Sequence, residues 1–171
     1  MQVPVSADSW FAWCVRPRHE KSVKKILDYK GYVTSLPLRK CYHTRRTGSA
    51  WESEKPLISG YVFVASDPNN PFHIVTTPGV IKAVGFGAGA VAIPRGEIET
   101  LERIGGSQLP VAACAYTRAG ELVELIGGPL KGVQGIVIRE SGATHLVVGI
   151  TMLQRAVSVE IENTWAVPSR N

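Results

Sequence analysis

Short apolar runs, separated by polar or glycine- and proline-containing segments, recur along the chain, a pattern that predicts strands. Before residue 107, strand-like runs are expected at 10–15, 32–38, 61–65, 80–84 and 91–93. Two longer segments, 19–30 and 94–104, space their apolar residues for one face of a helix, and a short helix is expected at 72–76. We therefore expect an α/β sandwich in which helices flank a mostly antiparallel sheet.

Two apolar runs joined by glycines dominate the region after residue 119. Leu122–Ile126 and Ile136–Ile138 have strand composition, and the glycines and proline between them favour a turn. Gly135, where the second run begins, predicts a bulge or a close backbone approach. Further strand-like runs follow at 146–148 and 157–161, so the C-terminus is expected to form a small, closed, SH3-like β-barrel.

The pattern therefore predicts an α+β protein with two domains. Segment 107–118 has little periodicity and contains Pro110, so we expect it to be the linker between them. This assigns residues 8–106 to the α/β sandwich and residues 119–171 to the β-barrel.

A polar excursion at 39–54 interrupts the apolar pattern of the first domain. It contains Arg45, Arg46 and Trp51, and we expect it to form a protruding loop or a loose hairpin. Such loops often carry contacts. A solvated insertion and a contact with nucleic acid or protein are equally open interpretations.

The composition is that of a soluble globular protein, with 44% hydrophobic and 19% charged residues. No apolar run approaches the roughly 20 residues that span a bilayer, and the first nine residues lack the features of a signal peptide. A cytoplasmic location is therefore expected. The three cysteines suggest neither a disulfide framework nor a zinc site, because they are widely spaced, at Cys14, Cys41 and Cys114.

The net charge of +5 is unevenly distributed. Between Arg16 and Arg46, ten lysines and arginines stand against two acids, whereas from Ala119 onward four stand against five. A basic patch on one domain suits binding to a polyanion, and the start of the first expected helix offers N–H groups and cations to a phosphate. A solvated lysine-rich helix face is the alternative, but the neighbouring aromatic residues favour nucleic acid.

Residues that would mark a catalytic or metal site are scattered. The four histidines show no spacing typical of metal ligands, and the sequence has no phosphate-binding Gly-x-x-x-x-Gly-Lys loop. The glycines at 85–89 precede a strand rather than a helix, so they indicate a hairpin turn rather than a dinucleotide site. We expect a binding protein, not an enzyme, with no cofactor and no metal.

Several motifs in a fixed order resemble those of NusG-type transcription factors. Gly-Pro-Leu-Lys-Gly-Val-Gln-Gly at 128–135 is similar to the KOW motif of that family. Trp-Phe-Ala-Trp-Cys at 10–14, Gly-Tyr-Val-Phe-Val at 60–64 and the segment 77–86 resemble the family's N-terminal (NGN) domain. Segments 56–64, 84–88 and 93–94 are closer to specialised paralogs such as RfaH and the capsule-operon antiterminators than to the housekeeping factor.

The resemblance implies a factor that binds RNA polymerase, suppresses pausing and promotes antitermination, acting as a monomer. In the family the NGN domain binds the clamp helices of the largest polymerase subunit through an apolar patch, which here corresponds to Trp10, Ile58, Tyr61, Phe63 and Phe86. Ordinary core positions are the alternative for this set, Phe63 and Phe86 above all. Contact with the non-template DNA strand is implied for Arg16, Arg18, His19 and Lys21.

The KOW domain of the family recruits a second partner, either a small-subunit ribosomal protein or the terminator Rho. The ribosomal protein is favoured here, because RfaH-like paralogs are antiterminators. The corresponding partner-binding residues are Leu130, Lys131, Met152, Leu153 and Arg155. Frequent β-branched residues and glycines after Gly120 favour a permanent barrel over the helical hairpin of RfaH. The alternative function is that of a KOW-containing ribosomal or RNA-binding protein.

Overall fold

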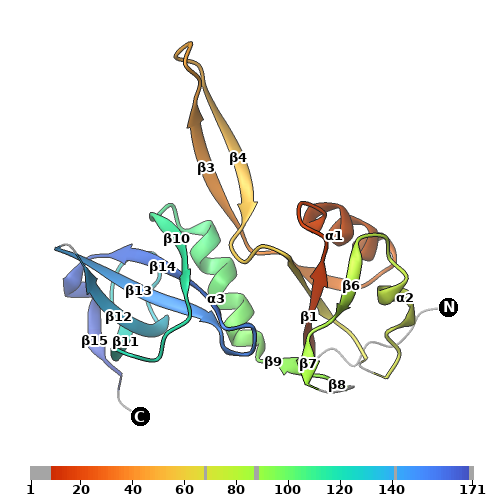
Figure 1. Cartoon of the computed structure of the whole chain (residues 1–171). Coiled ribbons are helices and arrows are strands. Elements are labelled where there is room, and N and C mark those ends of the chain that lie inside the picture. Colours follow the sequence, from red (N-terminus) through yellow and green to blue (C-terminus); the bar gives the residue numbers. More distant parts are fainter. Residues whose placement is uncertain (1–8, 68, 87–88, 141, 170–171) are drawn as a thin grey trace. The chain divides into compact units, whose positions relative to one another are not determined.

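The computed structural model of this protein describes residues 9–67, 69–86, 89–140 and 142–169. The chain groups into two compact units (Figure 1). The N-terminal unit comprises Met1–Leu36 and Ser59–Ile98, and the C-terminal unit comprises Pro37–Ile58 and Glu99–Asn171.

An antiparallel sheet in the order β2-β5-β1-β6, with β9 also paired to β1, forms the centre of the N-terminal unit. Helix α1 packs on β2 and β5, and α2 packs on β6. The elements are β1 (Trp10–Val15), α1 (Glu20–Tyr29), β2 (Val33–Ser35), β5 (Tyr61–Ala65), α2 (Phe72–Val75), β6 (Val80–Ala83), β7 (Gly85–Phe86), β8 (Gly89–Ala90) and β9 (Ala92–Ile93).

The core of this unit forms where α1 meets the sheet. Val23 and Leu27 of α1 are buried, as are Val62 and Val64 of β5. The alternation of β5 places Tyr61 and Phe63 on the opposite face, as the sequence predicts. Gly31, in the left-handed conformation with φ +88°, ends α1 because a residue with a Cβ is disfavoured there.

A six-stranded antiparallel sheet, ordered β10-β14-β13-β12-β11-β15, forms most of the C-terminal unit. The unit also contains a separate two-stranded hairpin and most of helix α3. Its elements are β3 (Leu38–Thr44), β4 (Ala50–Pro56), α3 (Arg95–Gly106), β10 (Val111–Ala115), β11 (Glu121–Leu125), β12 (Gln134–Glu140), β13 (Ala143–Ile150), η1 (Thr151–Leu153), β14 (Arg155–Ile161), η2 (Asn163–Trp165) and β15 (Ala166–Pro168).

The predicted α+β fold class is confirmed: an N-terminal part in which helices pack on an antiparallel sheet is followed by a C-terminal β domain. The close approach predicted at Gly135 is also present, because a Cβ built there would lie 2.7 Å from the carbonyl oxygen of Val147. The predicted buried face of α3 is confirmed, since Ile98, Leu101 and Ile104 are all in the interior.

The expected linker differs from the structure in one respect. Residues 111–115 form strand β10, which pairs antiparallel with β14. A short run of small residues at the edge of a sheet has weak periodicity, so its strand depends on a partner distant in sequence. The domain boundaries 8–106 and 119–171 stay a prediction. In the division of the chain into compact units, the hairpin and the end of α3 group with the C-terminal sheet.

Candidate functional site

Strand pairing brings three of the five predicted polymerase-binding residues to one face of the N-terminal sheet. In β1 and β5, Trp10 pairs with Ala65, Ala12 with Phe63 and Cys14 with Tyr61. Because directly opposed residues of an antiparallel pair share a face, Trp10, Phe63 and Tyr61 lie on the same side. We call this side the Tyr61 face.

The exposure of these residues differs. Trp10 and Phe63 are buried, with 7% and 1% of their surface exposed, whereas Tyr61 is only half-buried. Ile58 is also buried, and it belongs to the C-terminal unit. Phe86 lies in β7, but its side chain is outside the described part of the structure. The role of these residues in binding polymerase stays a prediction. Among the four whose side chains the structure describes, Tyr61 is the most exposed.

A tight turn joins β1 to α1 and carries the predicted DNA-binding residues. Arg16 donates its backbone N–H to the carbonyl of Gly79 at 2.8 Å, and His19 donates to the carbonyl of Arg16 at 3.0 Å. Arg18 adopts φ +66°, an uncommon conformation for a residue other than glycine. The turn and the first residues of α1 present four side chains that are all exposed: Arg16, Arg18, His19 and Lys21.

Glu20, which sequence reasoning treated only as a local negative charge, fixes this turn from inside. It is buried, and its Oε1 accepts the backbone N–H of Gly60 at 2.9 Å. The N–H of Val15 donates to the carbonyl of the same Gly60 at 2.9 Å. The sequence signal for a structural role of Glu20 was its position as the first residue of α1, where the helix dipole favours acidic residues.

These bonds connect the basic turn to the Tyr61 face. Gly60 directly precedes Tyr61, and Cys14, near the end of β1, pairs with Tyr61 on one side and with Lys82 of β6 on the other. Lys82 is exposed and lies on the Tyr61 face, although nothing in its sequence context had marked it. The N-terminal unit thus combines a half-buried aromatic residue with exposed cations.

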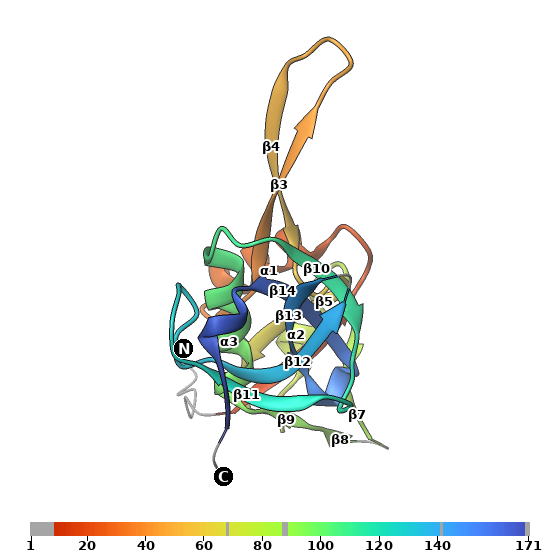
Figure 2. The ribbon, with the colours of Figure 1, turned by 90° about the vertical axis from the view of Figure 1, so that its left-hand side faces the viewer.

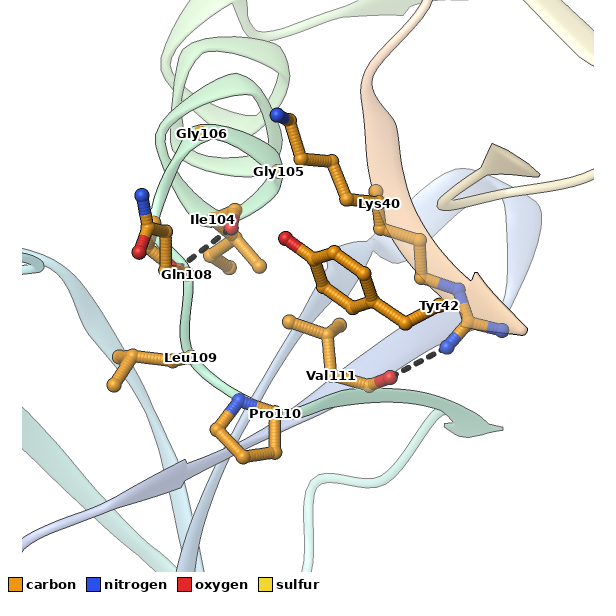
Figure 3. A pocket seen from close by; sticks show the side chains of 11 residues that line it. Lys40, Tyr42, Ile104, Gly105, Gly106, Gln108, Leu109, Pro110 and Val111 are labelled. Carbon is orange, nitrogen blue, oxygen red and sulfur yellow. Dashed lines mark hydrogen bonds between the residues drawn. The ribbon is translucent and has the colours of Figure 1, made fainter. Parts of the chain in front are cut away.

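A pocket of about 540 Å³ lies within the C-terminal unit, at the base of the β3–β4 hairpin (Figure 3). The Tyr42 side chain points from β3 toward the end of α3, and Arg39 donates to the carbonyl of Val111 at 2.6 Å. No His, Cys, Asp or Glu is among the described residues that line the pocket. It therefore offers cations and a phenol but no pair for acid–base chemistry.

The five predicted partner-binding residues of the C-terminal domain divide into interior and surface positions. Leu130 is completely buried and Leu153 is buried, so both belong to the core. Met152 is half-buried, whereas Lys131 and Arg155 are exposed. Arg155 and Gln154 line an open groove with Cys114 and Tyr116.

The chemistry of this groove is that of a contact surface. Tyr116 shares a hydrogen bond of 3.0 Å with the hydroxyl of Thr151. Burial raises the pKa of the Cys114 thiol above its ordinary value, against a smaller lowering by a hydrogen bond with Ser158. A thiol with a raised pKa is a poor nucleophile, because the thiolate is the reactive form.

Within the described ranges, no three His, Cys, Asp or Glu side chains gather closely enough to hold a metal ion. Of the helices in the described parts of the chain, none is both long and apolar enough to cross a membrane.

Comparison with known proteins yields a family and a fold. The family described as "Transcription termination factor nusG" matches residues 8–102, more than half of the chain. None of the curated proteins matches the sequence. A solved structure of NusG from Thermotoga maritima, titled for its domain interaction, is 18% identical, with a TM-score of 0.56, and the match covers 95% of this chain and 98% of that one.

Two structures of the MjSpt4:Spt5 complex also match, but more distantly. Conformation A is 16% identical and conformation B 17%, each over 95% of this chain and 99% of that one, with a TM-score of 0.30. That score carries no argument about this chain. The match over residues 8–102 shows the family, and the similarity to Thermotoga NusG shows the fold. This chain belongs to the NusG family of transcription factors.

Proposed function

We propose that this NusG-family factor binds RNA polymerase through the Tyr61 face, contacts the non-template DNA strand with the Arg16–Lys21 turn, suppresses pausing and promotes antitermination. Within this proposal it is a specialised, RfaH-like paralog that works as a monomer in the cytoplasm. Its C-terminal domain recruits a second partner, with a small-subunit ribosomal protein favoured over Rho. It performs no catalysis itself, because its role is to hold macromolecules together.

The observation that carries the proposal is the linkage between the basic turn and Tyr61. Gly60 accepts the N–H of Val15 and donates its own N–H to Glu20, so the turn and the start of β5 are held as one unit. An aromatic residue that seats on protein and cations that follow a phosphate backbone can then act together. This arrangement suits a protein that contacts polymerase and DNA at the same time.

The proposal is tested by measuring binding to RNA polymerase for wild type and Tyr61→Ala. Loss of an aromatic anchor at the centre of an interface should weaken binding on the order of tenfold or more. Tyr29→Ala is the matched control, because Tyr29 lies on α1 with 93% of its surface exposed and should leave binding unchanged. Binding to free structured RNA without any binding to polymerase would instead favour a ribosomal or RNA-binding protein.

The DNA contact needs a separate measurement. Arg16→Ala and Lys21→Ala should weaken footprinting of the non-template strand in a bubble template, because each removes a charge available to a phosphate. Arg139→Ala, at an exposed position on β12, controls for a general loss of positive charge. An unchanged footprint with both turn variants would remove this role from the turn.

A further inference from the structure

The β3–β4 hairpin projects from its own unit, and neither the proposed polymerase contact nor the proposed DNA contact of the turn uses it. In both views of the ribbon it reaches beyond the sheet and helix of its own unit (Figures 1 and 2). Between Leu38 and Pro56, five lysines and arginines stand against two glutamates. The hairpin therefore carries a net positive charge away from the core of its unit.

Strand register separates these charges between the two faces of the hairpin. His43 pairs with Trp51 and Arg39 with Lys55, so these four residues share one face. On the opposite face, Lys40 pairs with Glu54 and Tyr42 pairs with Glu52. Both carboxylates of the hairpin thus lie on the second face, where Lys40 forms an ion pair with Glu52 at 3.0 Å.

The first face has an ordered aromatic pair near the tip. The rings of His43 and Trp51 are stacked, with centroids 4.1 Å apart and an angle of 20° between the planes. A hydrogen bond of 2.8 Å between His43 Nε2 and the hydroxyl of Ser53 orients the imidazole. Even so, 47% of the Trp51 surface is exposed. The indole is thus held in place while much of it stays open to a ligand.

Two exposed arginines lie in the turn next to this pair. The turn is closed by hydrogen bonds from Arg45 N–H to the carbonyl of Ser49 at 2.9 Å and from Gly48 N–H to the carbonyl of Arg45 at 2.8 Å. Arg45 and Arg46 therefore lie one strand pair beyond the stacked rings, after Thr44 and Ala50. An aromatic platform with adjacent cations and no carboxylate on its face suits a nucleic acid strand.

We propose that the β3–β4 hairpin is a second nucleic-acid contact, which binds single-stranded nucleic acid by stacking a base on Trp51 and pairing phosphates with Arg45 and Arg46. Stacking needs an unpaired base, since the bases of a duplex already stack on one another. A solvated arm would need no ordered ring pair. Binding to a protein would not need the stacked rings to lie on a face without carboxylates.

The test measures binding of the full-length protein to fluorescently labelled oligonucleotides of about 15 residues, oligo-dT and oligo-U, by anisotropy. Trp51→Ala should weaken binding on the order of tenfold, the effect expected for loss of one stacked base. Tyr42→Ala is the matched control, since Tyr42 lies on the other face of the same hairpin with 74% of its surface exposed, and it should stay within about twofold. The DNA and RNA arms identify which strand is preferred.

Further variants separate stacking from charge and from folding. Trp51→Phe keeps an aromatic face and should retain most of the affinity, whereas Trp51→Leu should not. The double change Arg45→Ala and Arg46→Ala should flatten the dependence of log K on log salt concentration by about 1.4, since each lost phosphate contact contributes about 0.7 for a single strand. These changes should persist when Arg16 and Lys21 are replaced, so the result does not depend on the turn.

Three outcomes would overturn the proposal. In the first, Trp51→Leu binds as well as Trp51→Phe, so that stacking plays no part. In the second, Tyr42→Ala loses as much affinity as Trp51→Ala. In the third, a duplex of the same length binds as tightly as either single strand. None of these measurements uses RNA polymerase, so failure here is distinguishable from failure of the proposed function.

Discussion

Leu130 and Lys131 are neighbours in the KOW-like motif, but their side chains lie in different environments. The KOW resemblance assigns Leu130 and Lys131 to one partner-binding turn, but the first is fully buried and the second is exposed. The backbone of Leu130 also stabilises the turn, because its carbonyl accepts a hydrogen bond from the N–H of Val133 at 3.0 Å. Neighbours in sequence thus divide between the core and the surface.

This division predicts effects of very different size on stability for two adjacent substitutions. Leu130→Ala should lower the free energy of unfolding by about 2–5 kcal/mol, because it leaves a cavity in the core. Lys131→Ala should change it by less than about 0.5 kcal/mol, because only an exposed side chain is removed. Urea denaturation of both variants provides the measurement. Equal and small losses would contradict the core role of Leu130.

Residue properties were predictable from sequence where they depend on near neighbours. The alternation in β5 correctly separates Tyr61 from Val62, because strand geometry alone fixes it. The burial of Glu20 was not predictable, because its partner is the N–H of Gly60, forty positions away. The exposure of Tyr61 relative to Phe63 likewise depends on what lies over the sheet rather than on the strand itself.

At the scale of elements, helix α1 is connected to strand β2 by Asp28. Its carboxylate accepts Lys24 Nζ at 2.7 Å within the helix, and the hydroxyl of Thr34 also donates to it. Burial alone raises the pKa of Asp28, but the hydrogen bonds from Lys24 and Thr34 and the charge of Lys24 outweigh it, so the pKa lies below its ordinary value of 3.8.

The lowered pKa predicts a pH-dependent contribution to stability. A carboxylate whose pKa is lowered by folding stabilises the protein above its unfolded pKa, and the contribution is lost as the pH falls through the folded pKa. Because Asp28 is well exposed to solvent, Asp28→Asn should cost only about 0.5 kcal/mol at pH 7. The difference in unfolding free energy between the variant and the wild type should disappear as the pH falls below 3.8, the ordinary pKa of the group. Urea denaturation across this range provides the test, with Glu121→Gln on β11 as a control, and a gap that does not change with pH would contradict it.

The elements with strong local signals were predicted, and the two edge strands of the C-terminal sheet were not. Helices α1 and α3 follow from apolar spacing, and β1 and β5 from continuous apolar runs. Strands β10 and β15 lie at the two ends of the six-stranded sheet, and their short sequences carry little pattern of their own. The hairpin of β3 and β4 was expected only loosely, because its polar residues pair with each other rather than with a core.

At the scale of the whole molecule, the β3–β4 hairpin and most of helix α3 belong to the compact C-terminal unit, although they precede its six-stranded sheet in sequence. A Cβ added to Gly105 would lie 2.2 Å from the carbonyl oxygen of Leu38, so the end of α3 packs directly on the start of β3. Arg39 then bonds to Val111 of the C-terminal sheet. The proposed division of labour follows the sequence motifs, with polymerase and DNA on the N-terminal domain and the second partner on the C-terminal domain.

This division of labour predicts that a chain truncated after Gly106 still binds RNA polymerase and still suppresses pausing. The truncation keeps the Tyr61 face, the basic turn, the hairpin and α3, and removes β10 through β15. Polymerase affinity should stay within about threefold of the full chain, a free-energy change below about 1 kcal/mol. Arg39 loses its carbonyl partner on Val111, so circular dichroism must first show that the truncated chain is folded. If the truncated chain is folded but no longer binds polymerase, the C-terminal domain must supply part of the polymerase contact.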